Sequence, residues 1–272
     1  MRGSLTVVGT GIQLACHLTP EARAHLIAAD EVLYLVGDLV AVSSLQRLNA
    51  NTRSLHDLYE PGRSRDETYD DIVAEILAAV RGGARVCVAL YGHPGVFARP
   101  AHQAVRRARA EGFPARMVPA VSAEDCLFAD LGVDPGENGC QSYEATDFLL
   151  RKREVDVSAA LVLWQISVVG NLTYAPDGDP SRLPVLVEYL CRFYPREHEV
   201  VLYEAAQFPG SEPIIQRPAL CELAAADISP ATTLYVPPTG RRAVDRELRE
   251  RLGLADASPA RTAAPAVSPL SS

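Results

Sequence analysis

The feature that most constrains the fold is a regular alternation of short apolar runs and helical patterns through the first half of the chain. Residues 5–8, 32–36, 86–91 and 115–118 are predicted strands, and helical patterns begin near residues 20, 68 and 100. The run at residues 86–91 is almost wholly apolar, as expected of a strand buried on both faces. This alternation predicts an α/β fold with a mostly parallel N-terminal sheet.

The second half of the chain predicts a second α/β lobe with a mixed sheet. Residues 159–165, 199–203 and 232–236 are predicted strands, with helical segments near residues 184–194 and 218–226. We therefore expect an N-terminal lobe at residues 1–120, a C-terminal lobe at residues 121–254 and a disordered tail at residues 255–272. The tail is expected because it is rich in Ala, Ser and Pro and has few large apolar residues.

Composition disfavours several classes of protein. Of the 272 residues, 48% are hydrophobic and 22% are charged, which is enough apolar material for packed cores. No stretch approaches the roughly 20 apolar residues of a membrane helix, and the N-terminus has no signal-peptide pattern, so we expect a cytoplasmic protein without membrane contact. The net charge of −8 disfavours a nucleic-acid partner. The six cysteines form no CxxC pair, so no metal site is expected.

Ligands of parallel sheets bind at loops beyond the carboxyl ends of the strands, which here lie at residues 9–12, 91–97 and 119–125. The GTG at residues 9–11 is a tight turn or part of a ligand loop, but Leu14 occupies the place of the third glycine in a dinucleotide fingerprint. The YGHPGVF run at residues 91–97 is more specific, because two glycines and a proline fix a sharp loop with aromatic and imidazole groups at its rim. This context makes His93 a candidate functional residue.

The segment at residues 55–69 carries a second group of candidates. Arg65 and Tyr69 are four residues apart, so on a helix they share one face. Together they can polarise and deprotonate a weakly acidic group if a cofactor pocket adjoins them. Without such a pocket, the segment is a solvated loop that enters a helix. Ser122 likewise has a simple structural explanation as the N-cap of a helix.

These motifs resemble the tetrapyrrole methylase family, whose members bind S-adenosylmethionine in a cleft between two α/β lobes. Within that family, the chain is similar to the peptide backbone α-N-methyltransferases that make borosins. The similar segments are GSLTVVG at residues 3–9, YGHPGVF at 91–97, VSAEDCLFADLG at 121–132 and YEATDFL at 143–149. The resemblance covers about residues 3–238 and implies a two-lobed, tetrapyrrole-methylase-like fold and a homodimer.

The resemblance also implies roles for individual residues. The implied cofactor contacts are Tyr91, His93, Val96, Ser122, Ala123, Gln165, Tyr203, Thr232 and Thr233. The implied catalytic residues are Arg65, Tyr69, Tyr91, Tyr59 and His56. His56 departs from the family pattern, because the fungal fused enzymes carry a tyrosine there, although an imidazole can still take part in proton transfer.

Fused borosin enzymes continue into a clasp domain and a hydrophobic core peptide that they methylate themselves. After Pro238 this sequence has a helical segment at residues 241–254 and the Ala/Ser/Pro-rich tail. We therefore expect a stand-alone enzyme that acts in trans on a separate, ribosomally made precursor peptide, as in RiPP biosynthesis.

The resulting hypothesis is methyl transfer from S-adenosylmethionine to a backbone amide nitrogen. Tyr69, with the pKa of its phenol lowered by Arg65, is the expected base. Tyr91 and Tyr59 would position the amide and stabilise its oxygen. Two alternatives stay open: methylation of a tetrapyrrole such as a corrin precursor, and a non-catalytic module that binds the precursor peptide.

Overall fold

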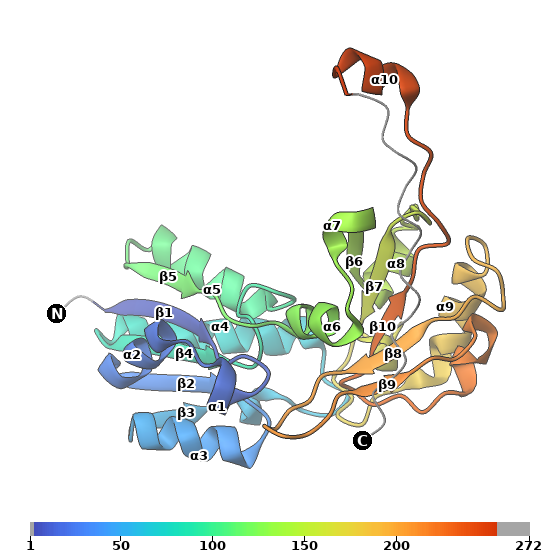
Figure 1. Ribbon diagram of the computed structural model, residues 1–272. Helices are drawn as coiled ribbons and strands as arrows, with labels where there is room; N and C mark the ends of the chain where they lie inside the picture. The colour runs from blue at the N-terminus through green and yellow to red at the C-terminus, as the bar shows by residue number, and fades with distance from the viewer. Residues whose placement is uncertain (1–2, 255–272) are drawn as a thin grey trace.

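A computed structural model describes residues 3–254 of the protein, and the predicted tail at residues 255–272 lies outside them. The chain forms two sheets that lie side by side, each with its own helices (Figure 1). Within the described residues, the structure contains no helix with the length and apolar character needed to span a membrane.

The first sheet has five parallel strands in the order β3-β2-β4-β1-β5. They are β1 (Ser4–Gly9), β2 (Glu31–Leu35), β3 (Thr52–Ser54), β4 (Arg85–Leu90) and β5 (Ala115–Val118). β4 is central, and Cys87 pairs with Thr6 of β1 on one side and with Val32 of β2 on the other. Every residue of β4 after Arg85 is buried, which explains its almost wholly apolar sequence.

Helices cover both faces of this sheet. They are α1 (Leu14–His17), α2 (Pro20–Ala28), α3 (Leu39–Leu48), α4 (Arg65–Arg81) and α5 (Arg99–Ala110), with a 3₁₀ turn η1 (His56–Leu58) before α4. Because strand side chains alternate, Val7 faces the core beneath α4 and α5, while Val8 faces the core beneath α2 and α3. Thr19 caps α2 by accepting a hydrogen bond from the Ala22 N–H, and Pro20 follows it at the first helical position.

The second sheet also has five strands, in the order β6-β7-β10-β8-β9. They are β6 (Cys140–Glu144), β7 (Ala160–Trp164), β8 (Val201–Glu204), β9 (Ile214–Gln216) and β10 (Thr233–Val236). β6 runs parallel to β7, and the other three pairings are antiparallel. The predicted α/β fold, with a parallel N-terminal sheet and a mixed C-terminal sheet, is confirmed.

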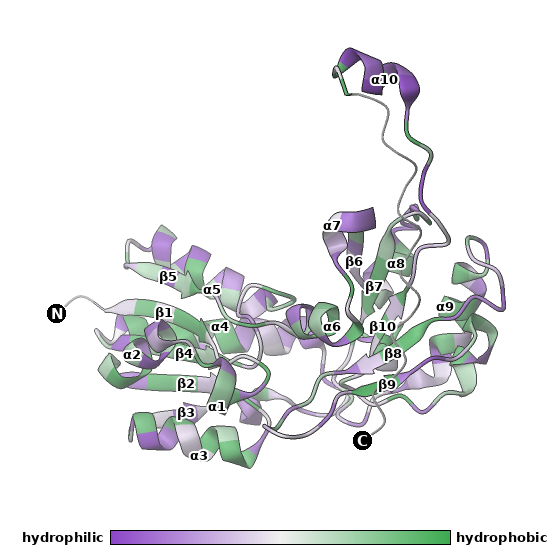
Figure 2. Cartoon of the chain, viewed as in Figure 1, coloured by the Kyte–Doolittle hydropathy of each residue, from purple (hydrophilic) through white to green (hydrophobic). Residues whose placement is uncertain are grey.

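Helices also pack on both faces of the second sheet, whose inner strand β7 is strongly hydrophobic (Figure 2). They are α6 (Ala123–Leu131), α7 (Pro135–Asn138), α8 (Ala145–Leu150), α9 (Leu183–Leu190), and the 3₁₀ turns η2 (Ile166–Val168), η3 (Pro180–Arg182) and η4 (Leu220–Ala225). α8 and α9 cover the face that carries Leu163, and α6 covers the face that carries Val162. α10 (Arg246–Arg251) extends away from both sheets (Figure 1).

Some elements differ from the prediction. α4 begins at Arg65, three residues before the predicted start, so the candidate arginine is the first residue of the helix. The predicted helical segments at 218–226 and 241–254 are reduced to η4 and α10. The sequence does not predict the edge strand β6. All five of its residues are half-buried, so its sequence lacks the alternation of apolar and polar residues that indicates a strand. The lobe boundary at residues 120 and 121 stays a prediction.

Candidate functional site

The loops that follow β1 and β4 meet at the carboxyl edge of the first sheet. Gly11 and Gly92 exchange two backbone hydrogen bonds of 3.2 and 3.1 Å. A Cβ at Gly9 would lie 2.2 Å from the Gly92 carbonyl oxygen and 2.7 Å from Pro94 Cδ. Glycine at residue 9 is therefore required by the contact between the two loops.

The YGHPGVF loop is closed by its own side chains and joined to the second sheet. His93 Nδ1 accepts a hydrogen bond of 2.9 Å from the Gly95 N–H. Phe97 has a φ of +50°, which a residue with a side chain rarely adopts, and its ring centroid lies 5.4 Å from that of Trp164. Because Trp164 ends β7, this contact places the loop against the second sheet.

A cavity of about 360 Å³, here named cavity A, lies between this loop and the ends of β7, β8 and β10. Its lining includes all nine residues that the sequence analysis assigns to cofactor contact: Tyr91, His93, Val96, Ser122, Ala123, Gln165, Tyr203, Thr232 and Thr233. It also includes Phe97 and Trp164, which were not predicted. The fold thus brings residues from both halves of the chain around one space.

Cavity A is lined by apolar and neutral polar side chains. The residues that line it in the described part of the chain include no lysine, arginine, aspartate or glutamate. Phosphate groups are normally bound by lysine or arginine side chains, or by a glycine-rich loop at a helix N-terminus. The volume falls within the range of about 300–1,000 Å³ that is usual for small-molecule sites. The cavity therefore suits a nucleoside-sized ligand without phosphates.

Two carboxylates hold hydroxyl groups at the edge of cavity A. The Tyr203 phenol donates a hydrogen bond of 2.6 Å to Asp130 Oδ2, and burial together with this carboxylate raises the pKa of Tyr203. Glu204 Oε1 accepts hydrogen bonds from the hydroxyls of Ser229, at 2.7 Å, and Thr232, at 2.5 Å. These bonds fix the segment before β10 against β8.

Ser122 is a helix cap that also lines cavity A. Its Oγ accepts a hydrogen bond of 3.2 Å from the Asp125 N–H, and the Asp125 carboxylate accepts one of 2.7 Å from the Ser122 N–H. This reciprocal capping box starts α6. The structural interpretation of Ser122 is therefore correct, and the helix start also places Ser122 and Ala123 at the cavity.

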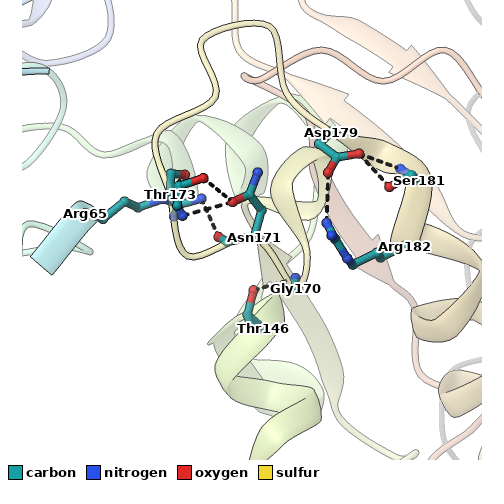
Figure 3. Close-up of polar contacts among 8 residues, drawn as sticks. All are labelled: Arg65, Thr146, Gly170, Asn171, Thr173, Asp179, Ser181 and Arg182. Atoms are coloured by element: carbon teal, nitrogen blue, oxygen red, sulfur yellow. Dashed lines mark hydrogen bonds and ion pairs between the residues drawn. The ribbon is translucent and has the colours of Figure 1, made fainter. Parts of the chain in front are cut away.

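The guanidinium of Arg65 is held by neutral acceptors. Nη1 donates to Gln165 Oε1 at 3.0 Å. Nη2 donates to the Asn171 carbonyl at 3.1 Å and Nε to the Thr173 carbonyl at 3.3 Å (Figure 3). Within residues 3–254 no carboxylate forms an ion pair with Arg65, whereas Arg63 pairs with Asp71. The positive charge of Arg65 is therefore oriented but uncompensated, and it can stabilise a negative charge that develops beside it.

Tyr69 lies one turn after Arg65 on α4 and is half-buried. Burial raises the pKa of the Tyr69 phenol above its ordinary value of 10.0, and the nearby charges of Arg65 and Arg99 offset only part of this effect. The prediction that Arg65 lowers the pKa of Tyr69 is therefore wrong in its net direction. The sequence spacing revealed the charged neighbour, but the loss of hydration that outweighs it depends on tertiary packing.

Two further cavities, B and C, are each lined by Arg65, Tyr69 and Gln165. Cavity B, of about 560 Å³, adjoins Phe97 and opens at the surface, because Leu150 and Leu172 in its lining are 74% and 68% exposed. Cavity C, of about 340 Å³, is lined in addition by Tyr59, Tyr174 and Pro176. Gln165 lines A, B and C, so the Arg65–Tyr69 pair stands where the two outer cavities approach cavity A.

The other residues predicted to be catalytic lie in different places. Tyr59 lines cavity C, and Tyr91, which is 45% exposed, lines cavity A. His56 Nε2 lies 3.0 Å from the Val36 carbonyl oxygen. His56 is absent from the described linings of cavities A, B and C, so the structure does not bring it to the site.

Sequence reasoning missed the residues that come from the connection between β7 and α9. Asn171 and Thr173 supply the carbonyl oxygens that hold Arg65, and Tyr174 lines cavity C. The segment carries no motif, and its partners are about a hundred positions earlier in the chain. No local pattern could have placed it beside α4.

Residues 4–218 match the family described as Tetrapyrrole (Corrin/Porphyrin) Methylases, and the chain belongs to this family. The fold is also that of a uroporphyrin-III-C-methyltransferase from Thermus thermophilus, with a TM-score of 0.62 and 23% identity over 94% of this chain and 99% of the other. A diphthine synthase has a TM-score of 0.60 and 16% identity over 88% of this chain and 91% of the other. At these identities, the likeness shows the fold alone.

Within the family, the chain has higher sequence identity to fungal proteins whose names combine a methyltransferase with a peptide precursor than to the two solved structures above. It is 40% identical over 251 residues to a methyltransferase/ribosomally synthesized cyclic peptide dendrothelin A precursor from Dendrothele bispora, covering 90% of this chain and 60% of the relative. It is also 40% identical over 257 residues to the corresponding omphalotin A precursor from Omphalotus olearius, covering 93% of this chain and 62% of the relative. The chain thus spans about three fifths of the length of these relatives.

Proposed function

We propose that the protein is an S-adenosylmethionine-dependent methyltransferase that methylates backbone amide nitrogens of a ribosomally made peptide. The observation that carries the proposal is the position of Arg65 and Tyr69, at the approach from cavities B and C to cavity A. The names of the fungal relatives, which join a methyltransferase to a cyclic peptide precursor, support a peptide as the substrate class.

The residues around cavity A fit S-adenosylmethionine. Hydroxyls of Ser122 and Thr232 can bind polar groups of the ligand, and the rings of Tyr91 and Trp164 can pack against its base or its sulfonium. No lysine or arginine is among the described residues that line cavity A, so no such side chain there would repel the positive charge of the sulfonium. When bound, the cofactor supplies a methyl group on a positively charged sulfur.

The amide is a weak nucleophile because its nitrogen lone pair is delocalised into the carbonyl group. Methylation breaks the N–H bond and the bond between sulfur and the methyl carbon, forms the N–C bond, and releases one proton. Negative charge develops on the amide oxygen as the proton leaves. Arg65 uses three donated hydrogen bonds to hold its position, and a guanidinium has five N–H groups. We therefore assign Arg65 to stabilise the amide oxygen.

Tyr69 is the proposed acceptor of the amide proton. Because burial raises its pKa, the phenolate is a minor form at neutral pH, and the rate should increase as the pH rises. Burial also raises the pKa of Tyr59, so this phenol stays protonated and can donate a hydrogen bond to the amide oxygen. Tyr91, on cavity A, is assigned to position the amide beside the methyl donor.

We further propose that the peptide is a separate chain and that the enzyme is a homodimer. The exposed rim of cavity B supports the first proposal, since a peptide can enter there without a covalent link. The homodimer is supported by the family resemblance and by large apolar side chains exposed on α3, Leu39 and Val40, and on α10, Leu248. Light scattering should give twice the mass of the chain; the mass of one chain would overturn the dimer.

The function is tested by incubating the purified protein with S-adenosylmethionine and synthetic peptides rich in valine, isoleucine and alanine. Tandem mass spectrometry should find methyl groups on backbone nitrogens. Arg65→Ala and Tyr69→Phe should abolish methylation while calorimetry shows that cofactor binding is retained. Arg107→Ala is the matched control, because Arg107 pairs with Asp70 of α4 and is absent from the described linings of cavities A, B and C. Methyl transfer to a porphyrinogen and to none of the peptides would overturn the proposal.

A further inference from the structure

The connection between β7 and α9 pairs with the start of α4. The Gly62 N–H donates to the Tyr174 carbonyl at 3.0 Å, and the Tyr174 N–H donates to the Arg63 carbonyl at 2.9 Å. The Arg65 N–H then donates to the Leu172 carbonyl at 3.1 Å. This short antiparallel pairing fixes the backbone of residues 172–174 relative to the proposed catalytic arginine.

Hydrogen bonds within the segment and to α8 also hold it in place (Figure 3). Asn171 Oδ1 accepts hydrogen bonds from the Thr173 N–H, at 2.9 Å, and the Thr173 hydroxyl, at 2.8 Å. The Gly170 N–H donates to Thr146 Oγ1 of α8 at 3.1 Å. Hydrogen bonds thus hold both ends of residues 170–174. The side chain of Tyr174 therefore extends from a backbone in a fixed position.

The side chain of Tyr174 lies on cavity C beside the proposed catalytic groups. Its ring centroid is 5.0 Å from that of Tyr59, and Arg65 and Tyr69 line the same cavity. The Tyr174 hydroxyl has no hydrogen-bond partner among residues 3–254. It is also not one of the buried polar atoms without a partner, so this hydroxyl is accessible. A phenol that lines the cavity from a fixed backbone, with its hydroxyl unpaired among the described residues, is able to bond a ligand there.

We infer that Tyr174 is a substrate-positioning residue that donates a hydrogen bond to a backbone carbonyl of the peptide on the cavity C side of the methylated amide. The inference rests on the proposed function. An extended peptide presents a carbonyl group at every residue, about 3.3 Å apart along the chain, so a peptide whose reacting amide lies at Arg65 places a neighbouring carbonyl within cavity C. The Tyr59 and Tyr174 rings and Pro176 provide the apolar surface around this bond.

The test compares Tyr174→Phe with Tyr189→Phe. Tyr189 is a matched control because it is also a half-buried tyrosine of the second lobe, but its hydroxyl bonds the Arg153 carbonyl at 3.2 Å, away from the cavities. With a synthetic valine, isoleucine and alanine peptide, Tyr174→Phe should raise the KM for the peptide about three- to tenfold, the worth of one neutral hydrogen bond. The kcat, the KM for S-adenosylmethionine and the melting temperature should stay near wild type.

The kinetic constants of Tyr174→Phe distinguish a positioning role from a chemical or a structural one. An unchanged KM for the peptide overturns the inference, and a loss of kcat at constant KM overturns it by assigning Tyr174 to the chemical step. A lower melting temperature with both KM values raised overturns it by showing a merely structural role. Wild-type protein that binds S-adenosylmethionine but does not methylate the peptide overturns the proposed function itself, whereas an active wild type with a normal Tyr174→Phe overturns this inference alone.

Discussion

Replacing Gln165 with glutamate tests whether the uncompensated charge of Arg65 drives the reaction. Gln165 Oε1 already accepts a hydrogen bond from Arg65 Nη1 at 3.0 Å, and glutamine and glutamate side chains have the same size. The new carboxylate would therefore lie against the guanidinium without repacking. The change adds one negative charge and leaves the geometry of the donors as it is.

The size of the effect follows from the distance between the two groups. Two unit charges about 3 Å apart attract by about 5 kcal/mol at an effective dielectric constant of about 20, and by about 1 kcal/mol in bulk water. Arg65 is half-buried, so the attraction lies between these limits. A counter-ion of this strength competes with the amide oxygen for the arginine. Loss of such stabilisation lowers kcat by about 100- to 1,000-fold, and we expect the lower end of this range for Gln165→Glu.

The assay measures peptide methylation by mass spectrometry and cofactor binding by calorimetry. Binding of S-adenosylmethionine should be retained or strengthened, because the new carboxylate lies in the lining of cavity A and attracts the sulfonium. Gln207→Glu is the matched control, since it adds the same charge to the lining of cavity A at a residue that makes no contact with Arg65 in the described structure. A kcat for Gln165→Glu within about threefold of wild type would refute the reasoning.

Three other perturbations address separate parts of the site. The kcat/KM should rise with pH and reach no plateau below about pH 10, because burial raises the pKa of Tyr69 above its ordinary value of 10.0, so the phenolate is a minor form throughout that range. A plateau at neutral pH in the rate profile would contradict this. Ser122→Ala should lower the free energy of unfolding by about 1 kcal/mol in urea titrations, because the capping box with Asp125 is lost, and an unchanged midpoint would count against it. Glu204→Ala should weaken S-adenosylmethionine binding, measured by calorimetry, because Thr232 loses its acceptor; equal affinity would show that the bond does not shape cavity A.

The predicted fold agreed with the structure where local sequence reflects burial. β4 is buried on both faces and its sequence is almost wholly apolar, so its position was predicted to within a residue. β6 is an edge strand with half-buried residues, and β3 has only three residues, so neither carries a periodic signal. The short helix α10 replaced a longer prediction because residues 241–254 have no sheet to pack against.

For the site, motifs identified candidates but not all their surroundings. The YGHPGVF loop and the Arg65–Tyr69 spacing are local, and the structure places both beside cavity A or its neighbours. The pKa of Tyr69 was predicted in the wrong direction because spacing shows charge and not desolvation. His56 shares a segment with Tyr59, yet its ring turns to the Val36 carbonyl.

The amino-acid sequence by itself determined the α/β class, the parallel and mixed character of the two sheets, and the loops that line cavity A, because apolar periodicity and turn residues act over short stretches of chain. Tertiary structure alone decided that the connection after β7 crosses to the start of α4. That contact supplies neutral acceptors to Arg65 and brings Tyr174 to cavity C. Its physical reason is the pairing of backbone groups about a hundred residues apart, and such pairing leaves no local pattern in the side chains.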